Sequence, residues 1–581
     1  MLSRRMRAAS VIAVVASMAV AQSPVAGTLA SEGTPVPPAA VPPMTVAQAC
    51  TVAERPLKDH VVDLSRLEDA GAVTISGETF AVGPGGWRGF VPAHPSTSQV
   101  FHSSAWLIGL YAVRPSQAVE LLLGQAQASP DPGAIAGRDA LVRGGWSESQ
   151  VTLRTWTALC LHGLSGDGRI VPIINALVKA NLDEARYYGP PLRAPHNHGV
   201  FANEALRAVG LLLGRPGLVA RAAERLRVMF DEVFEPCGMM HEQASYYQVV
   251  NIRLWSRNLA DDTSEAVQGA MSRARAALAA LARPDGVLDP IGDGIAGIWD
   301  RERLAALGVS PGGEVFCPDT GWAAAHRALP DGRAQHHVAR FGPKPRLHGH
   351  DDHGSITWWL GQGEEGISVL ADRGHFDKRH DARRAWADSP AAHSVLRLVG
   401  GEAVGPTSGV RVQTPEGDSY RLITASPAGT AHRVLTMSAG DSVLGASDSF
   451  VSATGSRVSA VQGWQLGPEW ERARRHSAQS ADGAYTLTAF CHSEGKAWRA
   501  QVKGTRHFPG YRRTVPALEL RCWPPRASRI SIETIIVVGR GIPRARSVDG
   551  HLQVTTSTSS YTFTADGVMV EAPPEPRHGA R

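Results

Sequence analysis

The segment His348–Leu360 reads HGHDDHGSITWWL, and residues 366–396 continue as GISVLADRGHFDKRHDARRAWADSPAAHSVL. The stretch combines several aspartates with six histidines: His348, His350, His353, His375, His380 and His393. The runs SITWWL and GISVLA inside it are short, apolar and rich enough in β-branched and aromatic residues to form strands. Imidazoles and carboxylates placed at fixed points on a sheet are typical of a zinc site or of an acid–base site.

Upstream of this stretch the sequence has a helical period. Apolar residues recur at three- and four-residue spacing in segments joined by short connections, which predicts packed helical hairpins. The segments are His102–Val113, Pro115–Gln127, Ser147–Leu164, Ile170–Ala185, His198–Leu213, Pro216–Phe234, Gln243–Leu259 and Thr263–Ala282. Ser147 followed by Gln150 predicts a capping box at the start of one helix.

From about residue 320 the hydrophobic period changes to two, which predicts strands separated by Gly, Pro and Asp turns. The predicted strands are Val338–Phe341, Ser355–Leu360, Ile367–Ala371, Ser394–Leu398, Tyr420–Ala425, Arg457–Gln462, Tyr485–Phe490, Leu518–Cys522, Ile530–Val538 and Leu552–Thr556. Many short strands in succession indicate an antiparallel sandwich. We therefore expect a helical domain over residues 55–315, a β-sandwich over 316–571 and a loose tail over 572–581.

The N-terminus has the pattern of an export signal. Arginines precede the apolar run Ala8–Val20, and Ala19-Val20-Ala21 fits a cleavage site, so residues 1–21 are predicted to be a signal peptide. Residues 22–54 are rich in Pro and Ala, and we predict a disordered linker there. The mature protein is expected to be secreted or periplasmic, with no membrane association beyond export.

Composition limits the possible partners and the redox state. The formal net charge is +5, and no Lys/Arg tract is concentrated enough for a nucleic-acid binder, whereas an acidic substrate would suit this charge. Export permits disulfides among the six cysteines, which allow 15 complete pairings. Cys491 and Cys522 both lie in strand-like sequence, so their pairing is favoured, while the other pairings stay open.

Two segments of the helical half carry polar groups. HNHG at residues 196–199 places Asn197 and His198 at the start of a helix, where unpaired N–H groups favour an anion; alternatively, Asn197 only caps the helix. EQASYY at residues 242–247 places Tyr246 and Tyr247 about 100° apart on a helix, so at most one faces a given cleft. A tyrosine can transfer protons, although an aromatic pair on a helix is often packing.

In the opening stretch, His348 and His350 are two residues apart and would project from the same face of a strand. Asp372 follows one predicted strand and His393 precedes another. With His350 they can form a zinc site with three protein ligands and one open position. The alternative is a solvated His-rich turn.

Together these segments resemble the heparinase II/III-like polysaccharide lyases and the alginate lyases that share their architecture. The family pattern is matched in order by NHG at 197–199, EQASYY at 242–247, HGHDD at 348–352, DRG at 372–374 and AHS at 392–394. The resemblance covers nearly the whole mature chain. It implies an incomplete (α/α) toroid followed by an antiparallel β-sandwich, in agreement with the change of period.

The resemblance also implies roles for individual residues. Tyr247 matches the acid/base tyrosine, and Asn197 and His198 match the groups that neutralise the uronate carboxylate and assist proton removal. His348 matches the catalytic histidine of the sandwich domain. The structural zinc ligands correspond to His350, Asp372 and His393. A second tyrosine, which many relatives carry between the zinc-binding Asp and His, is missing from this sequence.

Candidate substrate-binding residues complete the predicted site. Trp106 and Trp146 could stack on sugars, and core packing is the alternative for each. Glu242 is a further candidate, as is Arg383, which belongs to the basic stretch Arg373–Arg384. The predicted reaction is β-elimination in a uronic-acid polysaccharide, either alginate, a heparan-type glycosaminoglycan or a bacterial exopolysaccharide. A glycoside hydrolase and a non-catalytic polysaccharide-binding protein are the competing hypotheses.

Overall fold

The structure is a computed structural model. It describes residues 44–58, 60–83, 86–87, 95–133, 145–343, 348–378, 381–400, 405–414, 417–539, 543–564 and 566–572. The predicted signal peptide therefore lies outside the described residues, as do most of the linker and nearly all of the tail. None of the described helices is long and apolar enough to cross a membrane.

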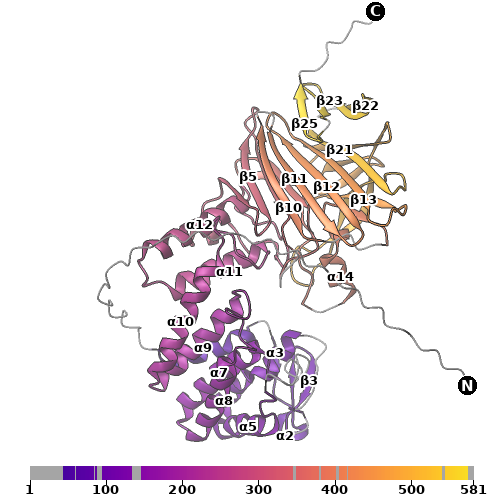
Figure 1. Cartoon of the computed structure of the whole chain (residues 1–581). Coiled ribbons are helices and arrows are strands. Elements are labelled where there is room, and N and C mark those ends of the chain that lie inside the picture. Colours follow the sequence, from indigo (N-terminus) through magenta and orange to yellow (C-terminus); the bar gives the residue numbers. More distant parts are fainter. Residues whose placement is uncertain are drawn as a thin grey trace, which may run out of the picture. The chain divides into compact units, whose positions relative to one another are not determined.

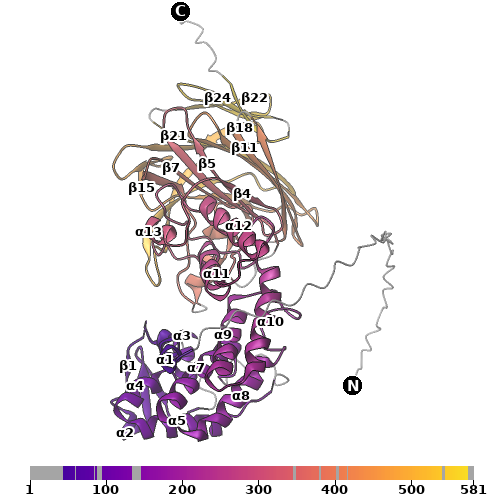
Figure 2. The ribbon, with the colours of Figure 1, turned by 90° about the vertical axis from the view of Figure 1, so that its left-hand side faces the viewer.

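The helical half follows the predicted pattern (Figures 1 and 2). Its helices are α1 (Val46–Glu54), α2 (Leu67–Ala70), α3 (Pro95–Ser103), α4 (Trp106–Val113), α5 (Pro115–Ala128), α7 (Glu148–Ser165), α8 (Val171–Leu182), α9 (Asn197–Leu212), α10 (Pro216–Val233), α11 (Ser245–Asn258), α12 (Glu265–Leu281) and α13 (Arg301–Ala305). A small sheet of β1 (Val62–Asp63), β2 (Ala72–Ile75) and β3 (Glu78–Ala81) packs near their start. Apolar faces of successive helices bury one another, as the 3.6-residue period requires.

Two local predictions for this half were wrong. Residues 46–54 of the expected linker form α1, capped by Thr45 and Gln48, and Cys50 of this helix is disulfide-bonded to Cys160 of α7. The disulfide and the burial of Ala49 and Ala53 anchor a segment whose composition had suggested disorder. Ser147 precedes α7 but makes no side-chain cap hydrogen bond, so the predicted capping box does not form.

The C-terminal half consists of antiparallel sheets, with strands β10 to β13 side by side in Figure 1. The first sheet has the order β4 (Glu314–Cys317), β5 (Trp322–Ala328), β6 (Ala334–Arg340), β7 (Ile356–Gln362) and β8 (Glu365–Leu370). The second, nine-stranded sheet contains β10 (Thr407–Thr414), β11 (Gly417–Ser426), β12 (Gly429–Ser438), β13 (Val443–Ser452), β15 (Trp470–Arg474), β16 (Ser477–Ser480), β17 (Thr486–Ser493), β18 (Lys496–Arg499) and β21 (Arg529–Gly539). One apolar core includes side chains from both sheets.

Two four-stranded sheets complete this half. One comprises β19 (Gln501–His507), β20 (Val515–Cys522), β14 (Ala460–Gln465) and β9 (Leu396–Leu398), and the other β22 (Arg544–Val548), β23 (His551–Thr555), β24 (Ser560–Phe563) and β25 (Met569–Ala572). The helix α14 (Ala382–Asp388) lies between β8 and β9 in the sequence. The pairing of Cys491 with Cys522 is confirmed, and it joins β17 to β20.

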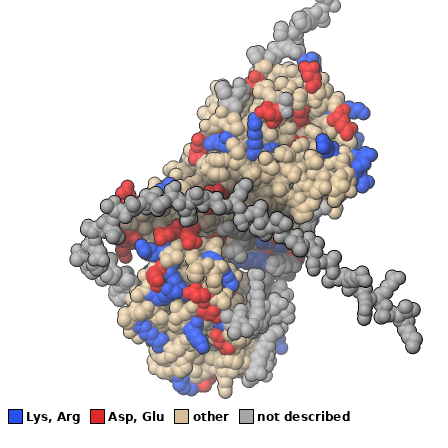
Figure 3. All heavy atoms as spheres, in the orientation of Figure 1, with Lys and Arg blue, Asp and Glu red and all other residues tan. Residues whose placement is uncertain are grey.

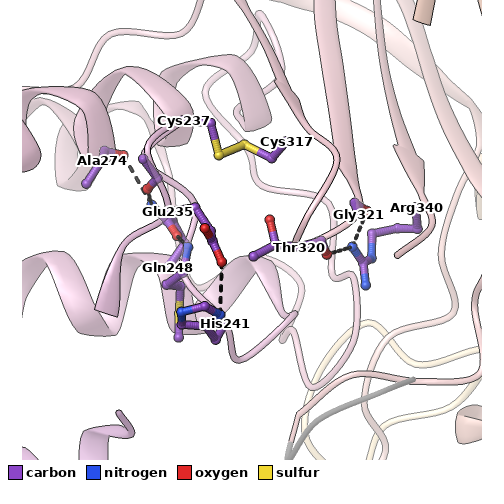
Figure 4. The surroundings of a disulfide bond; sticks show 11 residues. Glu235, Cys237, His241, Gln248, Ala274, Cys317, Thr320, Gly321 and Arg340 are labelled. Atoms are coloured by element: carbon purple, nitrogen blue, oxygen red, sulfur yellow. Dashed lines mark hydrogen bonds and ion pairs between the residues drawn. A yellow bond between two sulfur atoms is a disulfide. The ribbon is translucent and has the colours of Figure 1, made fainter. Parts of the chain in front are cut away.

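A third disulfide ties the last helices to the first sheet (Figure 4). It joins Cys237, in the turn after α10, to Cys317 of β4. The same turn is held by Gln248, whose side chain donates to the carbonyl oxygens of Gly238 at 2.9 Å and Ala274 at 3.2 Å. Helix α12 also contacts β4 and β5. The chain between Cys237 and Tyr247 is therefore fixed against both halves.

Removing this disulfide is predicted to destabilise the protein. The double substitution Cys237→Ser, Cys317→Ser opens a loop of 80 residues, and we expect the free energy of unfolding to fall by about 2–5 kcal/mol. Denaturant titration followed by tryptophan fluorescence measures the change, with the Cys50→Ser, Cys160→Ser protein as a comparison. An unchanged unfolding midpoint would show that the non-covalent contacts of this turn suffice.

Candidate active site

The start of α9 is capped by side chains of the protein itself. His196 is the N-cap, and its Nδ1 accepts a hydrogen bond from the His198 N–H at 3.1 Å. The Asn197 N–H donates to Glu242 Oε1 at 3.2 Å, and the Gly199 N–H donates to the His196 carbonyl at 2.9 Å. The prediction that these N–H groups are free for a substrate anion was therefore wrong. The alternative prediction, that Asn197 caps the helix, was also wrong, because His196 is the cap.

His198 forms a hydrogen-bonded pair with Glu148, the first residue of α7. Its Nδ1 lies 3.1 Å from Glu148 Oε1, and 35% of its side chain is exposed. Burial alone would raise the pKa of Glu148, but the hydrogen bond from His198 outweighs this effect and lowers it. An ionised carboxylate thus orients the ring. Glu148 was not predicted, because its sequence context suggests only an acidic first turn of a helix.

Tyr247 stacks on His348. Their ring centroids are 3.5 Å apart and the ring planes differ by 10°. Tyr247 lies in the first turn of α11, whereas the preceding Tyr246 packs against the core of the helical half. Burial raises the pKa of Tyr247, and the negative charges of Asp293 and Glu242 raise it further. The phenol is therefore neutral at pH 7 in this site.

Glu242 connects the two halves of the site. Its Oε1 accepts from the Asn197 N–H and, at 3.0 Å, from Asn251 Nδ2, while its Oε2 lies 3.3 Å from His196 Nε2 and 3.4 Å from His348 Nε2. Only 2% of the residue is exposed. The prediction that Glu242 binds substrate directly does not agree with this burial. Its observed contacts instead hold Asn197, His196 and His348 together.

Burial raises the pKa of Glu242 to about 8. Between pH 4.5 and 8 the folded protein therefore keeps a proton that the unfolded chain, with an ordinary glutamate, has lost. The stabilisation by the protonated Glu242 carboxyl group is complete below the pKa that Glu242 has in the unfolded chain. It is lost as the pH rises through about 8, the pKa in the folded protein. We expect the protein to lose on the order of 3–5 kcal/mol of stability over this range through Glu242.

Unfolding at several pH values tests this expectation. Glu242→Gln carries no titrating group, so the stability difference between wild type and variant should shrink or reverse as the pH rises from 5 to 8. A difference that stays constant with pH would show that Glu242 is already ionised in the folded protein.

Asp293 is the centre of the site on the sandwich side. Its Oδ2 lies 3.0 Å from His348 Nδ1, and its Oδ1 lies 3.2 Å from His350 Nε2, 3.1 Å from His375 Nδ1 and 2.8 Å from an Arg384 guanidinium nitrogen. Burial would raise the pKa of Asp293, but the hydrogen bonds from the three histidines hold it well below its ordinary value. An ionised Asp293 thus fixes four cationic or donor groups at once.

The position of Asp293 depends on Gly292. This glycine has φ +64°, and a Cβ there would lie 2.6 Å from the His348 carbonyl oxygen. The Asp293 N–H donates to that same oxygen at 2.8 Å. The sequence GDG at 292–294 suggests only a turn, so Asp293 was not predicted; the close approach of this turn to His348 explains the glycine.

Among the described residues, two groups of three side chains have possible metal-ligand atoms that all lie within 4.8 Å of one another. In the first, His196, Glu242 and His348, the cap hydrogen bond leaves His196 Nδ1 unprotonated, so the neutral ring carries its proton on the Nε2 that faces Glu242. In this tautomer Nε2 carries a proton and is not free to bind a metal. In the second, Asp293, His350 and His375, the Arg384 guanidinium already neutralises Asp293.

The predicted zinc ligands lie near one another but are not such a group. His393 Nδ1 is 2.9 Å from Asp372 Oδ2, and the ring centroids of His350 and His393 are 5.6 Å apart. His350 Nδ1 and His393 Nε2 are buried and have no hydrogen-bond partner within the described part of the chain. Asp293 and Asp388 lie 3.2 Å from His350 Nε2, so they can orient its ring for a ligand at Nδ1. The ligand atoms of these three residues do not all lie within 4.8 Å of one another in the described structure, so zinc binding at this position stays a prediction.

The predicted tryptophan platforms do not lie on the surface. Trp106 is 1% exposed and stacks on Trp87 in the helical core, and Trp146 is 4% exposed beneath the Arg154 guanidinium. Core packing, the alternative, is correct for both. Arg383 is exposed, and its guanidinium lies 4.9 Å from the ring centroid of Phe376.

A search of solved structures finds proteins of similar fold. The fold is similar to that of heparinase III. One heparinase III structure has a TM-score of 0.63 at 10% identity, with 82% of this chain and 84% of that chain covered. Another has a TM-score of 0.55 at 12% identity, with 92% of each chain covered. The heparan sulfate lyase HepC from Pedobacter heparinus has a TM-score of 0.52 at 14% identity, with 93% of this chain and 91% of that chain covered.

These likenesses confirm the fold class, a helical toroid followed by an antiparallel β-sandwich. No protein-family model matches the chain, and no curated protein matches it in sequence. The four predicted catalytic residues lie in one connected cluster in this fold, because Glu242 links Asn197 to His348, Tyr247 stacks on His348, and the ring centroids of His196 and His198 are 4.7 Å apart.

Proposed function

We propose that the protein is a polysaccharide lyase that cleaves a uronic-acid-containing polysaccharide by β-elimination. The observation that carries this proposal is the neutral Tyr247 stacked on His348 within a cluster of imidazoles that carboxylates orient. Such a cluster contains both a proton donor and proton acceptors, which β-elimination requires. The cluster is part of a fold similar to that of heparinase III.

Tyr247 is the proton donor in this proposal. Its raised pKa keeps the phenol protonated at neutral pH, which suits an acid that must deliver a proton to the leaving O4 oxygen. The negative charge of Asp293 opposes its ionisation, so the phenolate formed in the reaction recovers a proton readily.

His198 is the base. Its side chain is partly exposed, whereas the Nε2 atoms of His196 and His348 are buried. Glu148 accepts at Nδ1, which leaves Nε2 as the basic nitrogen. The C5 proton moves to His198 Nε2, the bond from C4 to O4 breaks, and O4 takes the Tyr247 proton. The products are a 4,5-unsaturated ring and a new end carrying a free hydroxyl group; no water is consumed.

Removal of the C5 proton requires neutralisation of the neighbouring carboxylate, because the developing charge spreads onto it. The α9 N–H groups are engaged, so this task falls to side chains at the start of α9. Asn197 is the candidate for it, because its side-chain Nδ2 can donate a hydrogen bond to a carboxylate oxygen. His348 is held by Asp293, and its ring stacks on the ring of Tyr247 and so holds Tyr247 in position.

A zinc ion bound by His350, Asp372 and His393 would be structural in this proposal. It would supply positive charge and a rigid link between the segments that follow β8 and precede β9, which carry these residues. Export through the N-terminal segment, as the sequence suggests, would bring the protein to an extracellular or periplasmic polymer. Alginate, heparan-type glycosaminoglycans and bacterial exopolysaccharides are the candidate substrates.

The hydrolase alternative is less well supported, because three of the four candidate carboxylates are engaged by partners; the fourth, Asp351, is half-buried and stays a candidate. A hydrolase needs two carboxyl groups flanking the scissile bond. Asp352 is buried and paired with Arg340 at 3.3 Å, Asp372 is paired with His393, and Glu242 lies between two imidazoles. These partners leave the three acids without access to a sugar.

A panel of uronic-acid polymers tests the proposal. We expect ultraviolet absorbance from the unsaturated ring to rise with at least one polymer, and no new absorbance with neutral polysaccharides. Chain cleavage without this absorbance would favour a hydrolase. Binding of a polymer without any product would favour the third hypothesis, a non-catalytic binding protein.

A further inference from the structure

An exposed aromatic ring lies beside the Asp293 cluster and has no role in the proposed reaction. Tyr511, in the loop of residues 508–513 between β19 and β20, is 39% exposed. Its ring centroid lies 6.3 Å from that of His375, whose Nδ1 contacts Asp293. Both predicted tryptophan platforms are buried, so Tyr511 offers the exposed aromatic surface that they do not.

The 508–513 loop is fixed to the segment that carries His375. The Phe508 N–H donates to the Arg373 carbonyl at 3.1 Å, and the Arg512 N–H donates to the Phe376 carbonyl at 2.8 Å. The buried Asp377 accepts from the Tyr511 hydroxyl at 2.7 Å and from Arg512 Nε at 2.9 Å. A loop held at this many points presents its side chains in a set arrangement, which lowers the entropic cost of binding a ligand.

The backbone of this loop is also strained. Arg512 has φ +59°, a left-handed conformation that a non-glycine residue adopts at a cost. The hydrogen bonds of Arg512 to Phe376 and Asp377 offset that cost. This conformation fixes the chain direction between Tyr511 and Arg513.

Cationic side chains surround Tyr511. The exposed ones on the loop and the adjoining segments are Lys378, Arg383, Arg506, Arg512 and Arg513. Arg383 and Arg506 lie over the rings of Phe376 and Trp386, at 4.9 and 4.8 Å from the ring centroids. Lys378 and Arg513 form no ion pair with any described residue. Burial lowers the pKa of His348, and the positive charge of Lys378 contributes a smaller part of this lowering.

The nearby carboxylates do not cancel this charge. Asp377 is buried and bound to Tyr511 and Arg512, and Asp381 caps α14 by accepting from the backbone N–H groups of Arg383 and Arg384. Asp388 is paired with Arg384 at 2.7 Å. On the face drawn in Figure 3, basic and acidic side chains are interspersed. The surface around Tyr511 therefore keeps cations available to an external anion.

We propose that Tyr511, Lys378 and Arg513 form a subsite for an acidic sugar unit next to the unit that reacts. The sugar ring packs on Tyr511, and its carboxylate or sulfate group binds the two cations. This inference rests on the proposed function, since it extends the same binding surface along the polymer. The subsite determines affinity and specificity and leaves proton transfer to Tyr247 and His198.

Substitutions at the three residues test the subsite on the full chain. With a polymer that is cleaved, Tyr511→Ala and the double variant Lys378→Ala, Arg513→Ala should each raise KM about tenfold while kcat stays within about threefold. The double variant should also show a weaker dependence of KM on salt. Tyr511→Phe, which keeps the ring and loses the hydroxyl contacts with Asp377 and the Lys378 backbone, should stay near wild type.

Two matched controls lie elsewhere on the surface. Trp523 is 46% exposed just beyond the far end of β20, about 25 Å from the loop by strand length. Arg474 is exposed at the end of β15. Trp523→Ala and Arg474→Ala should leave KM unchanged. A KM within twofold of wild type in both subsite variants would overturn the proposal, as would an equal effect of the controls.

The source of the anionic group follows from paired substrates. A polymer and its desulfated form, both with carboxylates, should lose affinity equally in the double variant if the subsite binds carboxylate. A loss confined to the sulfated form identifies sulfate. Equal affinity of wild type and double variant for both forms contradicts the subsite.

Binding measurements separate this proposal from the proposed function. Titration calorimetry of uronate oligosaccharides with Tyr247→Phe reports binding without turnover, with and without the subsite substitutions. If no polymer yields an unsaturated product while the subsite substitutions weaken binding about tenfold, the lyase proposal fails and the subsite stands. If product forms and binding is unaffected by them, the subsite fails and the lyase proposal stands.

Discussion

Tyr247→Phe should reduce the rate of formation of unsaturated product at least about 1,000-fold, a loss of about 4 kcal/mol in transition-state stabilisation. The substitution removes only the phenolic oxygen that donates the proton to O4. The ring remains, and with it the stacking on His348 at 3.5 Å between centroids. We therefore expect the structure and the affinity for substrate to change little.

The matched control is Tyr246→Phe, one residue earlier on α11. Tyr246 packs against the helical core, so its substitution should leave kcat within about threefold of wild type. Initial rates of absorbance increase at saturating substrate compare the variants. Wild-type kcat in Tyr247→Phe would exclude Tyr247 as the proton donor and direct attention to the imidazoles.

Asp293→Asn should reduce kcat by about 100-fold or more, because it removes the acceptor that holds His348 in place behind Tyr247. The amide replaces one carboxylate oxygen by a donor and removes the charge opposite Arg384, whose guanidinium is 2.8 Å away. Loss of one partner in a buried charged cluster also costs about 3–5 kcal/mol of stability. Activity should therefore be measured below the unfolding temperature of the variant.

Asp331→Asn is the control for Asp293→Asn. Asp331 is exposed and pairs with Arg333 in a turn outside the site, so its substitution should affect neither kcat nor stability strongly. Circular dichroism establishes whether each variant is folded at the assay temperature. A folded Asp293→Asn protein with wild-type kcat would show that His348 does not need this orientation.

The sequence predicted the architecture well because both halves have clear hydrophobic periods. Helices such as α10, which runs from Pro216 to Val233, begin and end within a few residues of the predicted bounds. The strand β21 extends from Arg529 to Gly539 where Ile530–Val538 was predicted. The helix α1 was missed because its flanking Pro/Ala-rich segment suggests disorder, whereas its disulfide, its capping box and the burial of two alanines anchor it.

The candidate site was predicted less completely, because many of its contacts join residues far apart in the sequence. The motifs containing Asn197, Tyr247 and His348 were found from their residue types. Asp293 and Glu148 were not, since a GDG turn and an acidic first turn are common for structural reasons alone. Burial likewise cannot be read from a single tryptophan, which is why Trp106 was proposed as a sugar platform and lies in the core.

The second tyrosine that is missing between Asp372 and His393 marks another limit of sequence patterns. In the structure a tyrosine from a distant loop, Tyr511, lies near His375 of that segment. The hydrogen bonds between the 508–513 loop and residues 373–377 bring the two together. Such a contact between segments more than one hundred residues apart leaves no local pattern in the sequence.

Digestion of a uronate polymer in water enriched in heavy oxygen tests the central claim most directly. Elimination consumes no water, so mass spectrometry of the products should find unsaturated ends and no incorporation of heavy oxygen at the cleaved bond. Over the same time, Tyr247→Phe should give no detectable unsaturated ends and no cleavage with heavy oxygen. Saturated ends that carry heavy oxygen would contradict the account, because they would show that the site hydrolyses the glycosidic bond.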